Sequence, residues 1–412
     1  MATRRTRPLF TSNSDLVVIR RFCQHTGVFF APLLVLCASF ECAVWRTGES
    51  WPLARVVDTQ LSLGTTPSLY GRMLFSQQFN VYKYYMIKRT RPKIVVQGTS
   101  RVMQIRDFMF HPLEKWFYNA GGMIQSPQDV ASYAARIGSG DLPKPEVLIF
   151  GVDPWWVKEG NTHEGWLDSQ SLQDDVWLFP AHIEAARLLA RRRVFPWKAL
   201  LAGAPAPSPG YRYQAIGAKP LLDGSGFRLD GSLQLELEMV LESIRDPRYK
   251  DRHQILQMVT NDVEPFALPA RVDHRRIAML LTALTELQGM GIEVYVFLPP
   301  FASEVQTVFE TSPTWQPFWR AYHLDLPARL RAAGIVCFPL SVPQQDGFDD
   351  RHMYDGYHPT EIYAAALVKQ ILQQAAPHSL LRAVDLAYLD ALLSGTYATP
   401  LSFERPPLSA ED

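Results

Sequence analysis

The chain has 412 residues, 47% of them hydrophobic, 20% charged and 12% aromatic, which is enough for one large folded domain or two ordinary ones. Lysine plus arginine and aspartate plus glutamate each total 41, so the balance of charge argues against nucleic acid or another strongly anionic partner. The 10 tryptophans and 31 prolines suit a carbohydrate-handling protein, and the tryptophans suit a core-filling role equally well.

A long apolar segment lies near the amino terminus. Residues 26–45, TGVFFAPLLVLCASFECAVW, contain a single charged side chain, that of Glu41. Twenty helical residues rise about 30 Å, the thickness of a bilayer's hydrocarbon core. The arginines that precede it are Arg4, Arg5, Arg7, Arg20 and Arg21. This bias predicts a cytoplasmic leader at 1–25, one transmembrane helix at 26–45, and a periplasmic or extracellular body.

Three other interpretations of this segment fit less well. A cleaved signal peptide would have a shorter leader and an Ala-x-Ala site. A lipoprotein would need a small residue where Leu36 precedes Cys37. A buried amphipathic helix would carry polar residues at every third or fourth position. Of the four cysteines only Cys337 lies away from the segment, so neither an intradomain disulfide nor a CxxC metal site is expected.

Short β-rich runs and helical patterns alternate through most of the remaining chain. The runs, each closed by Gly, Asn or Pro, predict strands at 93–97, 115–119, 146–152, 293–299 and 334–340. The helical patterns occupy 126–138, 272–290, 316–333 and 360–375. This alternation predicts an α/β fold with three layers, in which helices cover both faces of a parallel sheet.

The chain divides unevenly around these elements. Residues 46–92 are interpreted as a connector between the membrane helix and the α/β domain, which we place at 93–379. An insertion at about 155–271 interrupts the alternation, and we expect it to cover the carboxyl ends of the strands, where open α/β sheets bind ligands. Residues 380–412 are predicted to form a C-terminal tail.

Residues with reactive or polar groups follow the first three strands. These segments are Gly98-Thr99-Ser100-Arg101, Asn119-Ala120-Gly121-Gly122 and Gly151-Val152-Asp153-Pro154. Far downstream, YDGYHPTE places Asp355 three residues before His358. A serine hydrolase needs a hydroxyl, an imidazole, a carboxylate that orients the ring, and donors for an oxyanion. A parallel sheet brings its carboxyl ends to one edge, so these groups are candidates for one site.

In this order the motifs resemble those of the SGNH (GDSL-like) esterases and acyltransferases. Gly98-Thr99-Ser100 is similar to the first block, typically Gly-Asp-Ser, with Thr99 in place of the acidic residue. Gly121 or Gly122 is similar to the glycine of the second block. Gly151-Val152-Asp153-Pro154 corresponds in position to the third block, Gly-x-Asn-Asp, and the Asp355–His358 pair matches the last, Asp-x-x-His.

The resemblance, which covers about 93–155 and 272–375, implies a flavodoxin-like SGNH fold and a set of roles. Ser100 would be the nucleophile, His358 the base and Asp355 the group that orients it. The oxyanion hole would use the amides of Ser100 and of Gly121 or Gly122. An ionised Asp153 would repel an oxyanion, so it must be protonated, turned away or used for substrate. Asn119 or Arg101 would then supply the missing stabilisation.

The same resemblance implies a membrane-anchored esterase or O-acyltransferase whose substrate is an acyl group, with acetyl favoured, on an extracytoplasmic polysaccharide. Anchored members of the family, such as the alginate acetylation proteins, modify cell-surface polymers. No cofactor-binding motif is visible, so a transferase would need a membrane-bound partner that exports the acyl group. The alternative is a non-catalytic scaffold subunit of a polysaccharide assembly complex, which Thr99 and Asp153 favour.

Simpler interpretations of the same residues remain open. Ser100 could only cap the helix that follows its strand, and Asp355 could only stabilise a turn. The segment HMYDGYH also offers His352, Asp355 and His358 as metal ligands, although two histidines six residues apart fit neither common helical ligand spacing. The distances among Ser100, His358 and Asp355 separate these alternatives.

Overall fold

The computed structural model describes residues 13–160, 165–168, 171–174, 176, 178–191, 197–207, 212–236, 251–268, 270–339 and 347–395. Its main feature is an all-parallel sheet of five strands, arranged in the order β10-β9-β4-β2-β3. The strands are β2 (Ile94–Gln97), β3 (Phe117–Asn119), β4 (Val147–Gly151), β9 (Glu293–Leu298) and β10 (Val336–Pro339). Each lies within one of the five predicted runs, so the α/β prediction is confirmed.

The strand order determines where a ligand site is expected. Numbered along the chain, the five strands run 2-1-3-4-5, the doubly wound order whose direction of winding reverses between the first and third strands. These two strands are β2 and β4, which pair in parallel register from Ile94 with Val147 to Gln97 with Phe150. A crevice at this reversal opens beyond their carboxyl ends, directly after which come Ser100 and Asp153.

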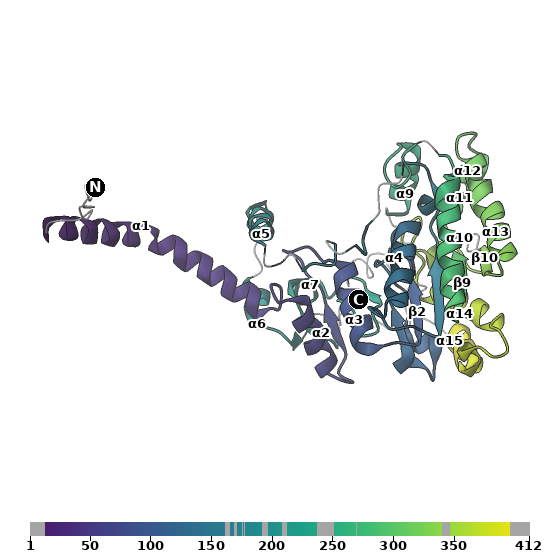
Figure 1. Ribbon diagram of the computed structural model, residues 1–412, viewed down its shortest axis with the longest axis horizontal. Helices are drawn as coiled ribbons and strands as arrows, with labels where there is room; N and C mark the ends of the chain where they lie inside the picture. Colours follow the sequence, from purple (N-terminus) through teal and green to yellow (C-terminus); the bar gives the residue numbers. More distant parts are fainter. Residues whose placement is uncertain are drawn as a thin grey trace, which may run out of the picture.

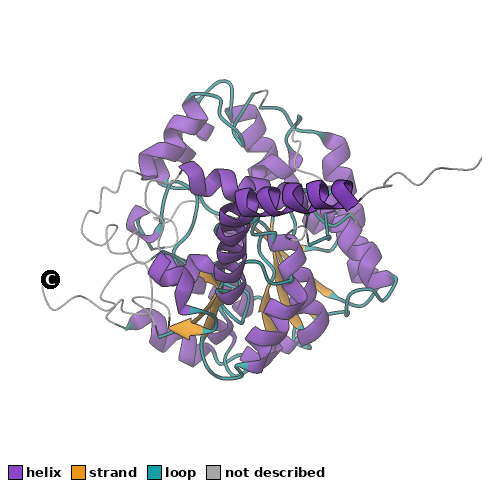
Figure 2. Cartoon of the chain, turned by 90° about the vertical axis from the view of Figure 1, so that its left-hand side faces the viewer, coloured by secondary structure: helices purple, strands orange, loops and turns teal. Residues whose placement is uncertain are grey.

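Both faces of the sheet are covered, as Figures 1 and 2 show. Because side chains alternate along a strand, Val95, Leu148 and Phe150 enter one core, whereas Ile94, Val96 and Ile149 enter the other. The first core packs against α4 (Pro127–Gly138), α10 (His274–Gly289) and α13 (Leu326–Ala332). The second packs against α14 (Glu361–Gln373) and α15 (Leu386–Ser394).

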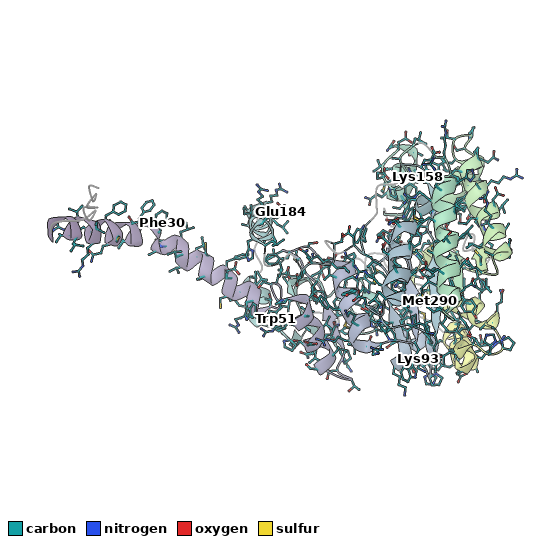
Figure 3. All side chains as sticks on the ribbon, in the orientation of Figure 1. Phe30, Trp51, Lys93, Lys158, Glu184 and Met290 are labelled. Carbon is teal, nitrogen blue, oxygen red and sulfur yellow. The ribbon has the colours of Figure 1, made fainter. Side chains whose placement is uncertain are left out.

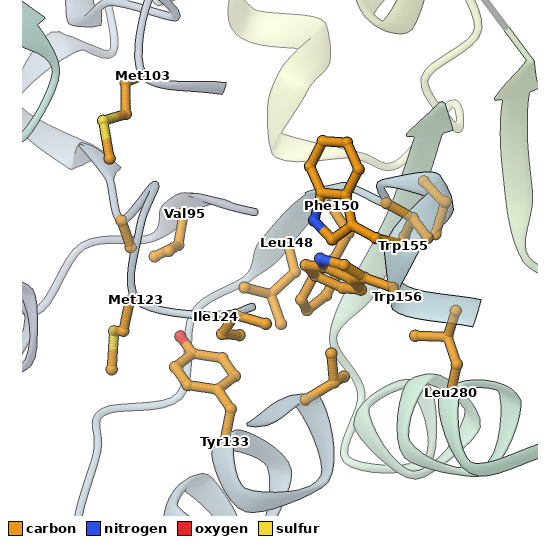
Figure 4. Close-up of a cluster of buried hydrophobic side chains, with 14 of the residues drawn as sticks. Val95, Met103, Met123, Ile124, Tyr133, Leu148, Phe150, Trp155, Trp156 and Leu280 are labelled. Atoms are coloured by element: carbon orange, nitrogen blue, oxygen red, sulfur yellow. The ribbon is translucent and has the colours of Figure 1, made fainter. Parts of the chain in front are cut away.

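The first core extends beneath the expected site. Figure 4 shows Trp155 and Trp156, which follow β4, clustered with Leu148 and Phe150 of that strand and with Leu280 of α10. Trp156 is fully buried and Trp155 is 7% exposed. The paired tryptophans are therefore part of the core in this structure and do not form an open platform for sugar.

A second, mixed sheet joins segments that the sequence separates widely. Its order is β5-β6-β1-β7-β8, with β1 (Ser68–Tyr70) parallel to β6 (Gln214–Ile216) and antiparallel to β7 (Gly226–Phe227). The outer strands are β5 (Ala206–Pro207) and β8 (Leu233–Gln234). The predicted connector and the predicted insertion thus fold together, because β1 belongs to the first and its partners to the second.

Smaller helices complete the body. Those before the parallel sheet are α2 (Leu53–Ser62) and α3 (Phe79–Thr90), and those of the insertion are α5 (Phe179–Arg191), α6 (Trp197–Ala202), α7 (Ala218–Leu222) and α9 (Asp251–Thr260). After β9 come α11 (Ser303–Thr311), α12 (Gln316–Arg320), and a π-helical segment, Ala321–Asp325, that leads into α13. In the predicted tail, α15 packs on α14, so this part belongs to the domain, and 396–412 lie outside the described residues.

One long helix projects from the body. Helix α1 (Asn13–Arg46) contains the predicted apolar segment but begins earlier, and its Leu16–Arg46 stretch of 31 residues is long and apolar enough to cross a membrane. Its apolar side chains are exposed, with Phe22 at 70% and Phe29 at 77%. The helix bends near Phe30, where Pro32 removes a backbone donor (Figures 1 and 3). Such a helix is consistent with a single membrane anchor or a signal sequence.

Candidate active site

The structure brings Ser100, His358 and Asp355 together at the carboxyl edge of the parallel sheet. The Ser100 Oγ lies 2.7 Å from the Nε2 of His358, and the His358 Nδ1 lies 2.7 Å from an oxygen of Asp355. Ser100 is half-buried, and the side chains of His358 and Asp355 are 25% and 20% exposed. The three groups therefore form a continuous hydrogen-bonded chain that solvent can reach.

Local sequence explains why the histidine and the carboxylate meet. One Asp355 oxygen accepts hydrogen bonds from the amides of Tyr357 and His358, at 2.8 and 2.7 Å, and the other meets the imidazole. Burial alone would raise the pKa of Asp355, but the imidazole and these amides hold that pKa below its usual value. Asp355 therefore stabilises the turn and orients the ring with the same carboxylate.

The hydroxyl of Ser100 is not used as a helix cap. A short 3-10 turn begins at Ser100, and the side chain that accepts from its first amides belongs to Thr99, whose Oγ1 lies 3.4 Å from the amide nitrogen of Arg101. Strand β2 ends at Gln97, and the position after it requires glycine because a Cβ at Gly98 would lie 2.8 Å from the Gly151 carbonyl oxygen and 2.8 Å from Val102. This close approach between β2 and β4 places Ser100 just beyond the carboxyl end of β2, with its hydroxyl directed to His358.

Arg101 and Asp153 form a buried ion pair beside the serine. Both side chains are at most 1% exposed, and the Arg101 Nη1 lies 2.7 Å from an oxygen of Asp153. The second Asp153 oxygen accepts from the Thr99 hydroxyl. Burial raises the pKa of Asp153, and Arg101 and Thr99 oppose this rise. Asp153 is thus turned into the protein, which is one of the three outcomes expected from the sequence.

Arg101 acts as a clamp between loops. Besides Asp153, it donates from Nε to the Tyr357 carbonyl at 2.8 Å and from Nη2 to the Pro300 carbonyl. It thereby ties the ends of β2, β4 and β9 to the turn that carries His358. Each of its three side-chain nitrogens donates to an acceptor in the protein, and its side chain is buried, so in this structure Arg101 is engaged internally and is not presented to a substrate.

The groups expected on the oxyanion side have internal partners as well. The Gly121 amide donates to the Asn119 side-chain oxygen and the Gly122 amide to the Gly98 carbonyl, both at 2.8 Å. The Asn119 side-chain nitrogen donates to the carbonyls of Val102 and Ile105, each at 2.8 Å. Asn119, Gly121 and Gly122 therefore do not present free donors in this structure. Among the residues that the structure describes, no acceptor is found for the Ser100 amide.

An aromatic wall, which sequence reasoning missed, supports His358. The Tyr357 ring lies 4.1 Å from the imidazole, centroid to centroid, and meets Trp155 and Phe266 edge-on at 6.1 and 6.3 Å. Phe266 comes from the insertion, as does Ile255 of α9, which packs against Gly356. The insertion therefore contacts the loop of the candidate site, which the clustering of aromatic residues in the sequence could not localise.

The alternative metal set does not assemble. His352 interacts through Nδ1 with Asp349, at 3.2 Å, and not with Asp355 or His358. Within the described parts of the chain, no group of three or more His, Cys, Asp or Glu side chains is arranged to hold a metal ion. Asp355 and His358 are instead engaged with each other and with Ser100.

Comparison with known proteins adds no family: the sequence matches no protein-family model and no curated protein sequence. The fold and the geometry define an α/β protein with a parallel five-stranded sheet and one apolar N-terminal helix. Any function must therefore be argued from the arrangement of its own residues.

Proposed function

We propose that the chain is a membrane-anchored serine esterase or O-acyltransferase of the SGNH type, acting on acyl esters, acetyl above all, of an extracytoplasmic polysaccharide. The observation that carries the proposal is the 2.7 Å contact between Ser100 Oγ and His358 Nε2, continued by the 2.7 Å contact to Asp355. Hydroxyl, imidazole and carboxylate in this order are the parts of a serine nucleophile with its base. The site's position at the reversal of the strand order supports it.

The proposed reaction has two steps. The Ser100 oxygen attacks the ester carbonyl while His358 Nε2 takes the hydroxyl proton, and Asp355 stabilises the imidazolium. The carbon–oxygen bond to the sugar breaks, and His358 returns the proton to the departing alcohol, which leaves an acyl-Ser100. In the second step water or another sugar hydroxyl attacks the acyl carbon and gives its own proton to His358. The bond between the acyl carbon and the Ser100 oxygen then breaks, and His358 returns the proton to Ser100. The Ser100 amide would donate to the oxyanion in each step.

A fluorophosphonate probe tests the nucleophile on the full chain in detergent. We expect the wild type to become covalently labelled, the Ser100→Ala variant to remain unlabelled, and the matched Ser139→Ala variant to label as the wild type does. Ser139 is an exposed helix-end serine whose hydroxyl donates only to the Arg136 carbonyl. Absence of labelling in all three proteins would contradict the enzymatic proposal.

The second candidate is a non-catalytic scaffold subunit of a polysaccharide biosynthesis or export complex. It is favoured by the internal hydrogen bonds of Asn119, Gly121 and Gly122, which leave the oxyanion side without its expected donors. A scaffold would bind its polysaccharide or partner equally with serine or alanine at position 100, and it would not react with the probe. Labelling of the wild type by the probe therefore separates the two functions, because an esterase can also bind its polysaccharide with alanine at position 100.

The proposed location is supported by α1. An uncleaved apolar helix with Arg20 and Arg21 near its amino end would anchor the body outside the cytoplasm. Resistance to carbonate extraction, together with digestion of the body by protease added outside intact cells, is the expected result. A native protein that begins after residue 46 would show a signal sequence instead. The transferase form of the reaction would also need a membrane-bound partner that exports the acyl group.

A further inference from the structure

Helix α5 lies against the body end of α1 and has no part in the candidate active site. Ala181, Ala185 and Leu188 of α5 share a small apolar cluster with Phe40 and Val44 of α1. The His182 Nε2 lies 3.3 Å from the Glu41 carboxylate, so one polar pair joins the two helices at this level. Figure 1 shows α5 standing away from the parallel sheet, near the body end of α1, and Figure 3 labels Glu184 on this helix.

Exposed apolar side chains gather around this junction. Trp45 at the end of α1 is 38% exposed, Leu178 and Ile183 at α5 are 52% and 38% exposed, and Leu201 on α6 is 50% exposed. Helix α6 packs on α1, and the Ala204 amide just after it donates to the Arg46 carbonyl at 2.6 Å. Three separate segments thus place large apolar side chains next to one end of an apolar helix. We call Trp45, Leu178, Ile183 and Leu201 the collar.

We propose that the collar rests on the outer surface of the lipid bilayer and sets the depth of α1. The proposal rests on the proposed membrane anchor. Water-exposed apolar side chains that gather in one place mark contact sites, and the collar residues lie on or beside the end of a helix most of whose apolar side chains are exposed. Tryptophan beside basic and apolar groups is typical of the membrane–water interface, and Arg55 stacks over the Trp45 ring at 4.7 Å.

The collar specifies which residues of α1 lie in hydrocarbon. If the level of Glu41 and His182 is the outer interface, the segment inside is 22–40, because the next charges on the inner side are Arg20 and Arg21. These 19 residues carry no Asp, Glu, Lys or Arg and rise at most about 29 Å along the helix, the thickness of a hydrocarbon core. The window of 26–45 expected from the sequence would instead bury the Glu41–His182 pair and Trp45.

Charges on the outward side of α5 agree with this placement. Arg187 and Glu184 are 66% and 61% exposed, and Arg191 follows one turn later. Beside them, Ile183, Ala186 and Ala190 form a narrow apolar stripe at positions three and four residues apart. An amphipathic helix with arginines next to an apolar stripe lies in the plane of the headgroups, where the guanidinium groups meet lipid phosphates.

Fluorescence quenching in vesicles tests the collar on the full chain. Cys23, Cys37 and Cys42 are replaced by alanine, the buried Cys337 is kept, and single cysteines are introduced for an environment-sensitive dye. Leu178→Cys, Ile183→Cys and Leu201→Cys probe the collar. Val263→Cys and Met279→Cys, at exposed apolar residues of the body outside the collar, are matched controls. Each variant must first show unchanged circular dichroism and melting temperature.

In phosphatidylcholine–phosphatidylglycerol vesicles, we expect a lipid-borne quencher near the headgroups to act several-fold more strongly on the three collar labels than on the two controls. A quencher near the bilayer centre should act more strongly on a label at Phe30 than at Leu36, because the midpoint of 22–40 is residue 31. The window 26–45 has its midpoint between 35 and 36 and predicts the reverse order.

The outcomes separate the collar from the anchor. Quenching of the Phe30 label with collar labels no more quenched than the controls would overturn the collar and leave the anchor standing. Stronger quenching at Leu36 than at Phe30 would overturn the proposed depth. If neither α1 label is quenched, or the mature protein lacks α1, the anchor itself fails, and the collar proposal fails with it.

Discussion

Ser100 and the turn that carries His358 meet through side-chain atoms 2.7 Å apart, whereas the polar groups of the loop after β3 donate to other acceptors inside the protein. We refer to these as the histidine side and the β3 side of Ser100. On the histidine side the side chains are partly exposed, and the Ser100 hydroxyl has one partner, the His358 imidazole, that can take its proton. The β3 side is buried, and the donors of Asn119, Gly121 and Gly122 are all in use.

For the proposed reaction, the difference means that the nucleophile already contacts its base, whereas the expected oxyanion donors of the loop after β3 are engaged elsewhere. The loop after β3 is closely packed, since a Cβ on Gly122, where φ is +87°, would lie 2.6 Å from Met103 and 3.1 Å from Phe79. An oxyanion in this structure would meet the Ser100 amide, and further donors would require that loop to rearrange. Activation of the nucleophile can therefore be tested with a probe alone, but stabilisation of the oxyanion requires an acyl ester.

Removal of the imidazole has the largest expected effect. In His358→Ala the Ser100 hydroxyl loses the only proton acceptor it has among the described residues, and we expect the rate of ester hydrolysis or of fluorophosphonate labelling to fall at least about 10³-fold. The matched variant is His378→Ala, whose side chain is 82% exposed and far along the chain from the site. Equal rates in wild type and His358→Ala would remove the histidine side from the mechanism.

Loss of the buried arginine should weaken the whole edge of the sheet. Arg101→Met leaves the buried Asp153 carboxylate without its cation, which costs about 3–5 kcal/mol of unfolding free energy. Adding Asp153→Leu should recover most of this loss, since no charge then remains unpaired. Urea unfolding measures both effects.

The control for that variant is Arg89→Met, which removes an ion pair with Asp58 whose two side chains are more than half exposed. We expect it to change the unfolding free energy by about 0–1 kcal/mol. Because Arg101 also holds the Tyr357 carbonyl, the double variant should be stable yet slow in hydrolysis. Full activity in the stable double variant would contradict the clamp described for Arg101.

Much of the histidine side could be predicted from the sequence, and little of the β3 side could. The runs that became β2, β4 and β9 are buried on both faces, and continuous apolar runs identify such strands without any tertiary information. Asp355 and His358 interact across a single turn, so their spacing in the sequence was enough to predict that they contact each other. Their contact with Ser100 could then be predicted, because the carboxyl ends of parallel strands lie at the same edge of the sheet.

The rest of the fold and of the site depends on contacts between segments far apart in the chain, which no short stretch of sequence reveals. Strand β1 has three residues and exists because it pairs with β6, about 145 positions away, so residues 46–92 were interpreted as a connector. The pairing of Arg101 with Asp153 depends on which strand lies next to β2, and the partners of the Gly121 and Gly122 amides depend on how one loop closes. Helix α1 continues on the amino side of the expected membrane segment, because Arg20 and Arg21 lie within the helix without ending it.

The pH dependence of stability tests the packing of the β3 side, where a buried lysine lies. Lys83 is fully buried and donates to the carbonyls of Asn119 and Gly231, and burial lowers its pKa to about 7. The unfolded chain keeps this proton up to a pH near 10.4, so between about 7 and 10 the unfolded state binds more protons. The free energy of unfolding should therefore rise with pH across this window, by up to about 1.4 kcal/mol per unit from this group.

Lys83→Met should flatten that rise, whatever it does to stability at a single pH. Lys115→Met, at an exposed lysine, should leave the slope unchanged. Chemical unfolding at several pH values between 7 and 10 gives the slopes directly. A wild-type slope that persists in Lys83→Met would show that the lysine is charged in the folded protein throughout the window.

The smallest expected effect tests how far the insertion supports the histidine side. A Cβ at Gly356, between Asp355 and Tyr357, would lie 2.5 Å from the Cβ of Ile255 on α9. Gly356→Ala must therefore displace either α9 or the turn, at a cost of about 1–3 kcal/mol. Gly289→Ala, at the end of α10 where nothing lies within 4 Å of an added Cβ, should be neutral or stabilising by up to about 1 kcal/mol.

Adding Ile255→Ala to Gly356→Ala makes room for the new methyl group, and the outcome identifies which element moved. If the turn is displaced, the single variant loses esterase rate as well as stability, and the double variant regains the rate because His358 returns to Ser100. If α9 is displaced, the rate hardly changes in either variant, since the Ser100–His358 contact does not involve α9. A rate that falls in Gly356→Ala and stays low with Ile255→Ala would show that the turn requires glycine for its own backbone, and the insertion would then have no part in holding His358.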